Sequence, residues 1–317
     1  MRYPTLKVAI GQIEPVWLNR QATTEKIIAS IKEASEQDCD LIAFSEGLLP
    51  GYPFWLEPTN AARFDNESIK TWHAHYLNEA VCIENGDLAS IQAACQLGNI
   101  ATYLGIIERP QDRGGHSCYA SLVYINAEGS IESVHRKLMP THEERLAWSI
   151  GDGNGLKVHP LKGFTVGGLN CWENWMPFAR ASLYAQGENV HVASWPGSDR
   201  NTKDITRFIA IESRSYIISA SSVLPKTSIP TSLPLYEEMV ANMAEVPANG
   251  GSCIADPNGN WLVAPIIDKE VLITAEINLE EVYKARNTFD PNGHYSRPDV
   301  FELKVNRKRQ HLADFTS

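Results

Sequence analysis

The sequence predicts an α/β fold, and more closely a layered α/β sandwich. Short runs rich in β-branched and aromatic residues alternate along the chain with longer stretches of helical periodicity. Two turn signals between such runs, "NAEGS" at 126–130 and "DPNGN" at 256–260, favour antiparallel strand pairs. The composition does not shift as it does at a linker, so one layered domain is favoured over two separate sheets.

Strands and helices can be assigned from these patterns. The runs with strand character are residues 6–13, 41–46, 99–108, 119–126, 130–137, 164–171, 189–194, 216–223, 252–257, 261–265 and 270–278. The stretches with helical character are residues 20–37, 66–83, 87–97, 177–188 and 204–215. The first helix is the clearest, because its apolar residues recur at helical spacing opposite charged ones.

The domain is expected to span residues 1–301. Within it, two stretches are typical of surface insertions: residues 52–70 and the Pro/Ser/Thr-rich residues 224–238. The polar tail of residues 302–317 contains a basic run and is expected to be solvated.

Composition excludes several classes of function. With 43% hydrophobic residues, 21% charged residues and a formal net charge of −10, the chain has material for a core but no basic excess. Binding to nucleic acid or to an anionic membrane is therefore not expected. No apolar run is long enough for a transmembrane helix, and the N-terminus enters a strand pattern without the features of a signal peptide. We therefore expect a cytoplasmic protein.

The cysteines and histidines do not form a metal-binding pattern. The six cysteines include no CxxC pair, and so we expect reduced and mostly buried thiols. The motif "THEER" begins like a metalloprotease helix, but Leu146 stands where a second histidine after His142 would be needed. No metal site is predicted.

Cys171 is a candidate nucleophile. It stands in "GGLNCWENWMPFAR", where a strand-like run gives way to a helix-like one. A helix capped near Asn174, with Pro177 in its first turn, would bring backbone N–H groups close to the sulfur and lower the pKa of the thiol. The alternative is a structural thiol packed in a core.

A nucleophilic cysteine needs a group that takes its proton and a group that stabilises the charge on the attacked atom. His135 and His142 are candidate proton acceptors, as in a papain-like hydrolase. Glu46 is another, because it ends the apolar strand "DLIAFSE", where burial would raise its pKa toward neutrality. Lys137, at the end of "SIESVHRK", could pair with a carboxylate or stabilise a developing anion.

Three of these residues match a known pattern. Glu46 in "FSEGLLPGYP", Lys137 in "HRKLMPTHEER" and Cys171 in "CWEN" resemble the Glu-Lys-Cys triad of the nitrilase superfamily of carbon–nitrogen hydrolases. The resemblance extends from "VAIGQIEP" at 8–15 to "GHYSRPDVF" at 293–301, which is nearly the whole chain. Three spaced motifs in the right order make a chance similarity improbable.

The resemblance implies a fold and a set of roles. The fold is a four-layer αββα sandwich with its site at the strand ends. Glu46 would be the general base, Lys137 the charge stabiliser and Cys171 the nucleophile. Glu144 would be a second carboxylate that positions Lys137 and helps to orient the substrate, and the backbone N–H of Trp172 would complete the anion-binding site. No cofactor and no metal are implied.

The residues beside the triad resemble true nitrilases, which convert a nitrile to the carboxylic acid and ammonia through a covalent thioimidate and thioester. These are "CWEN", "GDGNG" after Trp148, and "GHYSRPDVF". The alternative is an amidase or carbamoylase of the same superfamily, acting on a linear amide or an N-carbamoyl group. Trp55, Trp172 and Trp195 are candidates to line an apolar substrate pocket, or else are core residues.

The expected partners are a small nitrile and other copies of the chain. The family implies a homodimer built with helices 177–188 and 204–215, and larger spirals through the two insertions. The short tail disfavours long filaments. A scaffold with a dead site would require a missing triad member, and none is missing.

Overall fold

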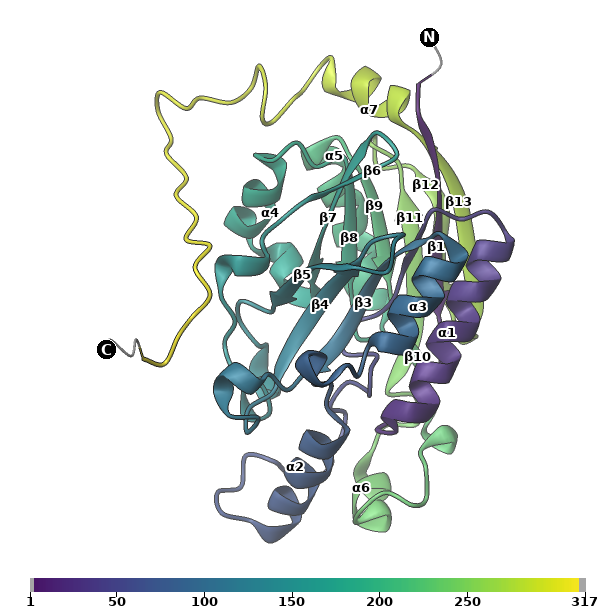
Figure 1. Cartoon of the computed structure of the whole chain (residues 1–317), viewed down its shortest axis with the longest axis vertical. Coiled ribbons are helices and arrows are strands. Elements are labelled where there is room, and N and C mark those ends of the chain that lie inside the picture. The colour runs from purple at the N-terminus through teal and green to yellow at the C-terminus, as the bar shows by residue number, and fades with distance from the viewer. Residues whose placement is uncertain (1–2, 314–317) are drawn as a thin grey trace.

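Two β-sheets lie face to face between two layers of helices in the computed structural model of the chain, which describes residues 3–313 (Figure 1). Apolar side chains from both sheets, such as Val8 and Val192, form the central core cluster. A second cluster joins the first sheet to α1 (Arg20–Glu36) and α3 (Ala89–Gly98). The opposite sheet packs on α4 (Pro177–Tyr184) and α5 (Asp199–Ser213). The predicted four-layer αββα sandwich is confirmed.

The first sheet has six strands in the order β13-β1-β2-β3-β4-β5. Their bounds are β1 (Thr5–Gln12), β2 (Leu41–Ala43), β3 (Ala101–Glu108), β4 (Tyr119–Ile125), β5 (Ile131–Arg136) and β13 (Val271–Asn278). β1, β2 and β3 are parallel, whereas the other neighbours are antiparallel. The turn predicted at 126–130 joins the antiparallel pair β4 and β5.

The second sheet has seven strands in the order β10-β11-β9-β8-β7-β6, with β12 paired to β11. Their bounds are β6 (His159–Leu161), β7 (Phe164–Asn170), β8 (Val190–Ser194), β9 (Tyr216–Ala220), β10 (Val223–Leu224), β11 (Ala248–Ala255) and β12 (Trp261–Ile267). β7, β8 and β9 are parallel, so their carboxyl ends meet at one edge. The turn predicted at 256–260 joins β11 and β12.

The five predicted helices are present, with ends that differ by a few residues. Besides those in the outer layers there is α2 (Glu67–Glu79), and two further helices were not predicted, α6 (Tyr236–Asn242) and α7 (Leu279–Arg286). Both are too short for a clear periodicity, as are the unpredicted strands β6 and β10. Across residues 3–313, no helix combines the length and the apolar character needed to cross a membrane.

The two stretches expected as insertions are anchored by a third apolar cluster. Trp55 and Leu56 from the first stretch pack there with residues of α2, and Ile229 and Leu233 come from the second. Figure 1 shows α2 and α6 at the same end of the molecule, below the sheets. These segments therefore have buried contacts of their own, although their status as insertions stays a prediction.

The C-terminal tail leaves the body after α7 and returns to it (Figure 1). The guanidinium of Arg309 lies 3.0 Å from Asp152 Oδ1, and the backbone N–H of Gln310 donates to Asp152 Oδ2 at 2.9 Å. The tail was expected to be solvated, and most of it is exposed, but these contacts anchor it beside β5.

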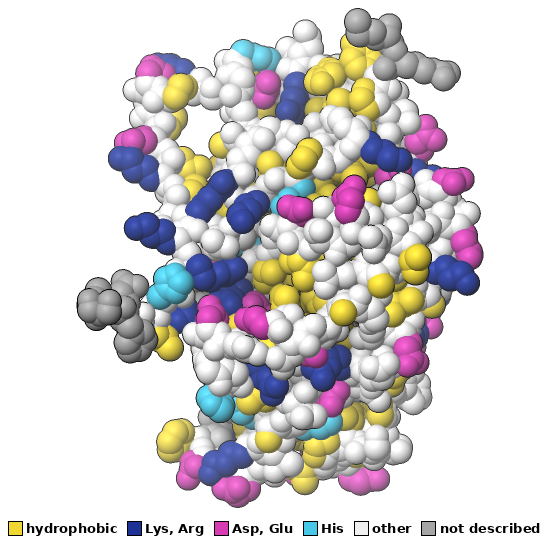
Figure 2. Space-filling view, viewed as in Figure 1, with side chains coloured by type: hydrophobic (Ala, Val, Ile, Leu, Met, Phe, Trp, Pro, Cys, Tyr) yellow, Lys and Arg dark blue, Asp and Glu magenta, His cyan; other side chains and the backbone are white. Residues whose placement is uncertain are grey.

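On the face shown in Figure 2, acidic and basic side chains are interspersed.

Candidate active site

Glu46, Lys137 and Cys171 meet where strands of the two sheets end. Glu46 follows β2, Lys137 comes directly after β5, and Cys171 comes directly after β7. All three side chains are buried. In layered α/β proteins, sites form at the carboxyl ends of strands because the loops there converge. The fold thus brings together three residues that are far apart in the sequence.

The ammonium group of Lys137 lies between two carboxylates. Its Nζ is 2.8 Å from Glu46 Oε1 and 2.7 Å from Glu144 Oε2. Burial by itself lowers the pKa of Lys137, but Glu46, Cys171 and Glu144 raise it by more, and the net shift is upward. Lys137 therefore stays protonated and is fixed in orientation.

The side-chain oxygens of Glu46 can still accept hydrogen bonds. Its backbone N–H donates to the carbonyl of Trp195 at 3.1 Å, which fixes the turn that carries it. Although Oε1 is close to the Lys137 ammonium, neither oxygen accepts a well-directed hydrogen bond from any group in residues 3–313. Burial raises the pKa of Glu46 to about 8, against the lowering effect of Lys137, and Glu144 raises it further. This matches the expected shift.

Glu144, in contrast, has its oxygens occupied. It lies in the 3₁₀ turn His142–Leu146, where its Oε2 accepts from the backbone N–H of Thr141 at 2.6 Å. Its Oε1 accepts from the hydroxyl of Tyr52 at 2.6 Å, and Oε2 also receives the bond from Lys137. These hydrogen bonds fix the side chain of Glu144 beside Lys137. Tyr52 was not foreseen from the sequence.

Cys171 occupies a strained position. It is the first residue of the 3₁₀ turn Cys171–Trp175, and its φ of 45° lies in the left-handed region. The predicted cap at Asn174 is wrong, because Asn170 precedes this turn and Met176 precedes α4. Pro177 does begin α4, as the sequence indicated.

The expected lowering of the thiol pKa is also wrong. Burial raises the pKa of Cys171 well above its ordinary value, and Glu46 raises it further. Lys137 and the backbone N–H of Trp172 act in the opposite direction but do not offset the loss of solvent. The resting enzyme therefore carries a neutral thiol.

The geometry indicates where the thiol proton can go. The sulfur of Cys171 and one oxygen each from Glu46 and Glu144 lie within 4.8 Å of one another. Because Glu144 already accepts three hydrogen bonds, Glu46 is the better proton acceptor. The same three donors could reach a metal ion by distance alone, but the ammonium of Lys137 already lies against both carboxylates.

The two histidine candidates have other contacts. His135 Nε2 lies 3.0 Å from both oxygens of Glu173, and the side chain of His142 is 89% exposed. Glu173 also accepts from the backbone N–H groups of Leu138 at 2.6 Å and Asn170 at 2.9 Å. Burial raises the pKa of Glu173, but His135 and these N–H groups lower it by more. His135 and Glu173 thereby tie the end of β5 to the end of β7.

The three tryptophans lie in different surroundings. Trp55 is buried and stacks on Trp72 with ring centroids 5.9 Å apart. Trp195 is buried in the same apolar cluster as Cys171. Only Trp172, beside the sulfur in sequence, is half exposed. Roles for these three side chains in substrate binding stay predictions.

A cleft of about 510 Å³ opens beside the cluster. Its walls come from residues 52–58, 196–201 and 242–247, together with Glu143. Tyr52 in this wall donates to Glu144, and Pro196 follows the residue that accepts the N–H of Glu46. The cleft thus adjoins the cluster through Tyr52, although Glu46, Lys137 and Cys171 do not line it themselves. No pattern in the sequence indicated a functional role for residues 242–247.

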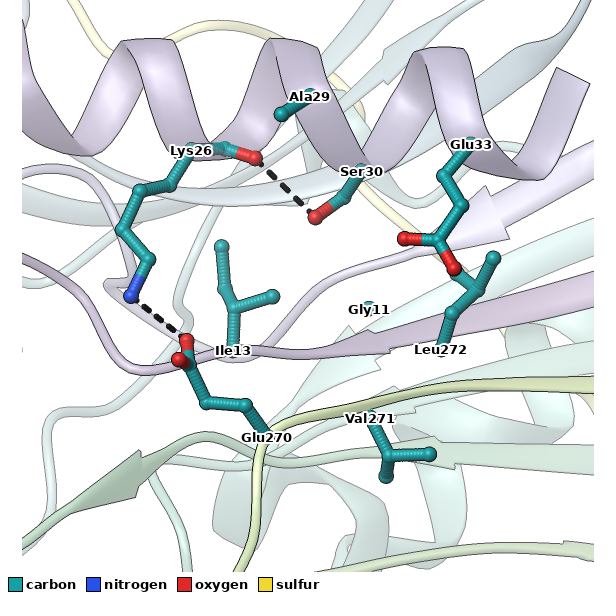
Figure 3. A pocket seen from close by; sticks show the side chains of 9 residues that line it. All are labelled: Gly11, Ile13, Lys26, Ala29, Ser30, Glu33, Glu270, Val271 and Leu272. Atoms are coloured by element: carbon teal, nitrogen blue, oxygen red, sulfur yellow. Dashed lines mark hydrogen bonds and ion pairs between the residues drawn. The ribbon is translucent and has the colours of Figure 1, made fainter.

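A second groove, of about 490 Å³, lies between α1 and the strands β1 and β13 (Figure 3). Across it, Lys26 Nζ is 2.6 Å from Glu270 Oε1, and Ser30 donates to the carbonyl of Lys26. Neither Glu46, Lys137 nor Cys171 lines it. It is a surface groove unrelated to the catalytic cluster.

Comparison with known proteins agrees with this geometry. Residues 7–287 match the model of the family described as carbon-nitrogen hydrolase. A nitrilase 2 from an unknown prokaryotic organism is 34% identical, over 96% of this chain and 93% of its own. An aliphatic nitrilase from Rhodococcus rhodochrous is also 34% identical, over 96% of this chain and 80% of its own.

The fold of an amidase from Nesterenkonia sp. is similar too. The two structures superpose with a TM-score of 0.66 at 15% identity, over 91% of this chain and 96% of the amidase. That likeness concerns the fold, whereas the family match covers most of the sequence together with the Glu-Lys-Cys cluster. The chain belongs to the carbon–nitrogen hydrolase family.

Proposed function

We propose that this enzyme is a nitrilase that hydrolyses an organic nitrile to the carboxylic acid and ammonia. The observation that carries the proposal is a lysine ammonium held between two buried carboxylates beside a thiol without a histidine partner. Such a site supplies a nucleophile, a base and a fixed positive charge. Full-length relatives that are 34% identical are named as nitrilases, which selects nitriles among carbon–nitrogen substrates.

In the first stage, Glu46 accepts the thiol proton of Cys171 while the sulfur attacks the nitrile carbon. One π bond of the nitrile breaks, and the nitrogen takes the proton back from Glu46, which gives a neutral thioimidate. Lys137 faces the negative charge that develops on nitrogen, and the backbone N–H of Trp172 adds a second donor. Glu144 holds Lys137 in place and helps to orient the substrate.

In the second stage, Glu46 accepts a proton from water as the hydroxyl adds to the thioimidate carbon, and this proton passes to nitrogen. The hydroxyl proton of this tetrahedral intermediate then passes through Glu46 to nitrogen as the C–N bond breaks, which releases ammonia and leaves a thioester. A second water molecule hydrolyses the thioester to the acid and restores the thiol. If the C–S bond breaks before the C–N bond, an amide is released instead.

Replacing Cys171 tests the reaction and the substrate class together. Wild-type enzyme should release ammonia from members of a panel of aliphatic, aryl and arylacetonitriles, with acid and amide products separated by mass spectrometry. Cys171→Ala should lower this turnover by at least about a thousandfold, because no other group can form the covalent intermediate.

Cys39→Ala is the matched control, since Cys39 is another buried free thiol but lies at the end of α1. If the enzyme turns over the matching amides but not the nitriles, it belongs instead to the amidase or carbamoylase branch.

Lys137 and His142 separate the triad from a cysteine–histidine mechanism. Lys137→Gln should reduce kcat at least about a hundredfold, because it removes the charge that faces the developing anion. His142→Asn should leave kcat within about twofold, because this exposed side chain touches none of the reacting groups. The measurement is steady-state kinetics with unfolding by urea as a check on folding. The reverse order of effects would favour the cysteine–histidine pair.

The pH profile should report the state of Glu46. With the pKa of Glu46 raised to about 8, the carboxyl is protonated below that pH and cannot accept the thiol proton. We therefore expect kcat/KM for a non-ionisable nitrile to rise about tenfold per pH unit up to about pH 8 and then level off. The charged groups that shift the pKa of Glu46 are Lys137, which lowers it, and Glu144 and Glu173, which raise it. A profile that is flat down to about pH 6 would contradict this role.

We also propose that two copies associate through α4 and α5. Phe178 on α4 and Phe208 and Ile211 on α5 expose apolar side chains on this helical layer, next to Trp175 and Met176. The guanidinium of Arg180 on α4 lies 5.6 Å from the ring of Phe208, so the two helices form one surface. Apolar patches of this kind mark protein–protein interfaces.

Phe208→Asp should shift the protein toward monomer in sedimentation velocity, because it places a charge in the centre of this surface. Leu97→Asp is the matched control, since Leu97 is also an exposed apolar residue but lies on α3 in the opposite helical layer. Equal effects of the two changes, or none from Phe208→Asp, would contradict the proposed interface.

A further inference from the structure

The side chain of Asn174 holds the backbone on both sides of the nucleophile. Its Nδ2 donates to the carbonyl of Leu169 at 3.2 Å and to the carbonyl of Cys171 at 2.9 Å. Both partners are acceptors, so the orientation of the amide is fixed and its Oδ1 can only accept. Asn174 is fully buried.

The group that Oδ1 meets is His191 on β8. His191 Nε2 lies 2.8 Å from Asn174 Oδ1, and because Oδ1 is an acceptor this nitrogen must carry a hydrogen. The other ring nitrogen, Nδ1, lies 2.9 Å from Glu188 Oε1. A lone pair facing a carboxylate would be repulsive, so one more proton must lie between them. The pair therefore holds one proton beyond a neutral imidazole and a carboxylate.

Several features of the fold make room for the chain Asn174–His191–Glu188 and anchor its ends. A Cβ added at Gly167 on β7 would lie 2.1 Å from Glu188 Oε1, so the strand needs a glycine opposite the carboxylate. The guanidinium of Arg286 donates to the backbone carbonyl of Glu188 at 2.6 Å. At the other end, Arg180 donates to the backbone carbonyl of Asn174 at 2.7 Å. Both ends of the chain are thus anchored to other elements.

A chain of buried polar groups is costly and needs a reason. The reason lies in the backbone of Cys171, whose φ of 45° is a left-handed conformation that is unfavourable for a residue with a side chain. Such a conformation persists only where surrounding contacts over-determine it. Asn174 supplies two of those contacts, and His191 fixes Asn174.

We propose that Glu188 and His191 are positioning residues that hold Asn174, and through it the sulfur of Cys171, in line with Glu46 and Lys137. This inference rests on the proposed role of Cys171 as nucleophile. None of the three groups touches the substrate. They set the geometry of attack, and a small misplacement of a nucleophile lowers the rate strongly.

The test compares three variants at two positions. His191→Phe keeps a ring of similar size but removes both hydrogen bonds. Glu188→Leu removes the partner of Nδ1. Glu188→Gln is the conservative rescue, because its amide N–H can donate to Nδ1 of a neutral imidazole and so complete the chain without the additional proton.

Two rates should report the position of the sulfur. One is steady-state turnover of a nitrile, and the other is the rate constant for alkylation of Cys171 by iodoacetamide, with the site verified by peptide mass spectrometry. His191→Phe and Glu188→Leu should lower kcat and the alkylation rate constant together, by about ten- to a hundredfold, with KM within about threefold. Glu188→Gln should stay within about threefold of wild type in both.

If Glu188 and His191 only stabilised the fold, their replacement would lower stability without lowering kcat and the alkylation rate constant together. Near-wild-type kcat and alkylation in folded His191→Phe would overturn the proposal, and so would equal damage from Glu188→Gln and Glu188→Leu. If His191→Phe does not fold, the comparison of the two Glu188 variants decides. Nitrile turnover that survives in Cys171→Ala would refute the nucleophile itself, which is distinct from a failure of the positioning chain.

Discussion

The pairing of one buried ammonium with two buried carboxylates is the constraint on which the site depends. Removed from water, Glu46 and Glu144 could not both be ionised without Lys137 between them, and Lys137 could not stay charged without them. The fold must therefore bring the ends of β2 and β5 to one point. Gly105 on β3 shows how close this approach is, because an added Cβ would lie 2.1 Å from the carbonyl oxygen of Ser45.

The same burial determines where protons lie before substrate arrives. It raises the pKa of both the Cys171 thiol and the Glu46 carboxyl, so the thiol keeps its proton until the attack and an ionised Glu46 is a stronger base for that proton. The positive charge of Lys137 favours the anionic form of each, and becomes most useful when negative charge moves onto the substrate. Lys137 is thus placed to stabilise negative charge that develops in the transition state, which is how an active site lowers the barrier electrostatically.

The sequence predicted a layered α/β sandwich and the strand ends that carry Glu46 and Lys137 because both depend on local signals, whereas the four-layer order came from the family resemblance. A buried apolar run that ends in Glu46 or Lys137 is visible without knowing the fold. Tyr52 and His191 were missed because their contacts with Glu144 and Asn174 join segments remote in sequence. The thiol pKa was predicted in the wrong direction for a related reason. The start of a helix after Cys171 can be predicted from the local sequence. The burial that raises the thiol pKa, however, depends on every element packed around the site.

Two supports of different character therefore meet at Cys171. On one side, an ion cluster places charge and accepts the proton. On the other side, a chain of hydrogen bonds through Asn174 holds the strained backbone of Cys171 in place. An apolar residue at Glu188 would avoid a buried carboxylate, but it would leave His191 Nδ1 without a partner and Asn174 without a fixed donor. The buried polar groups are best explained by the position they impose on the sulfur rather than by a contribution to stability.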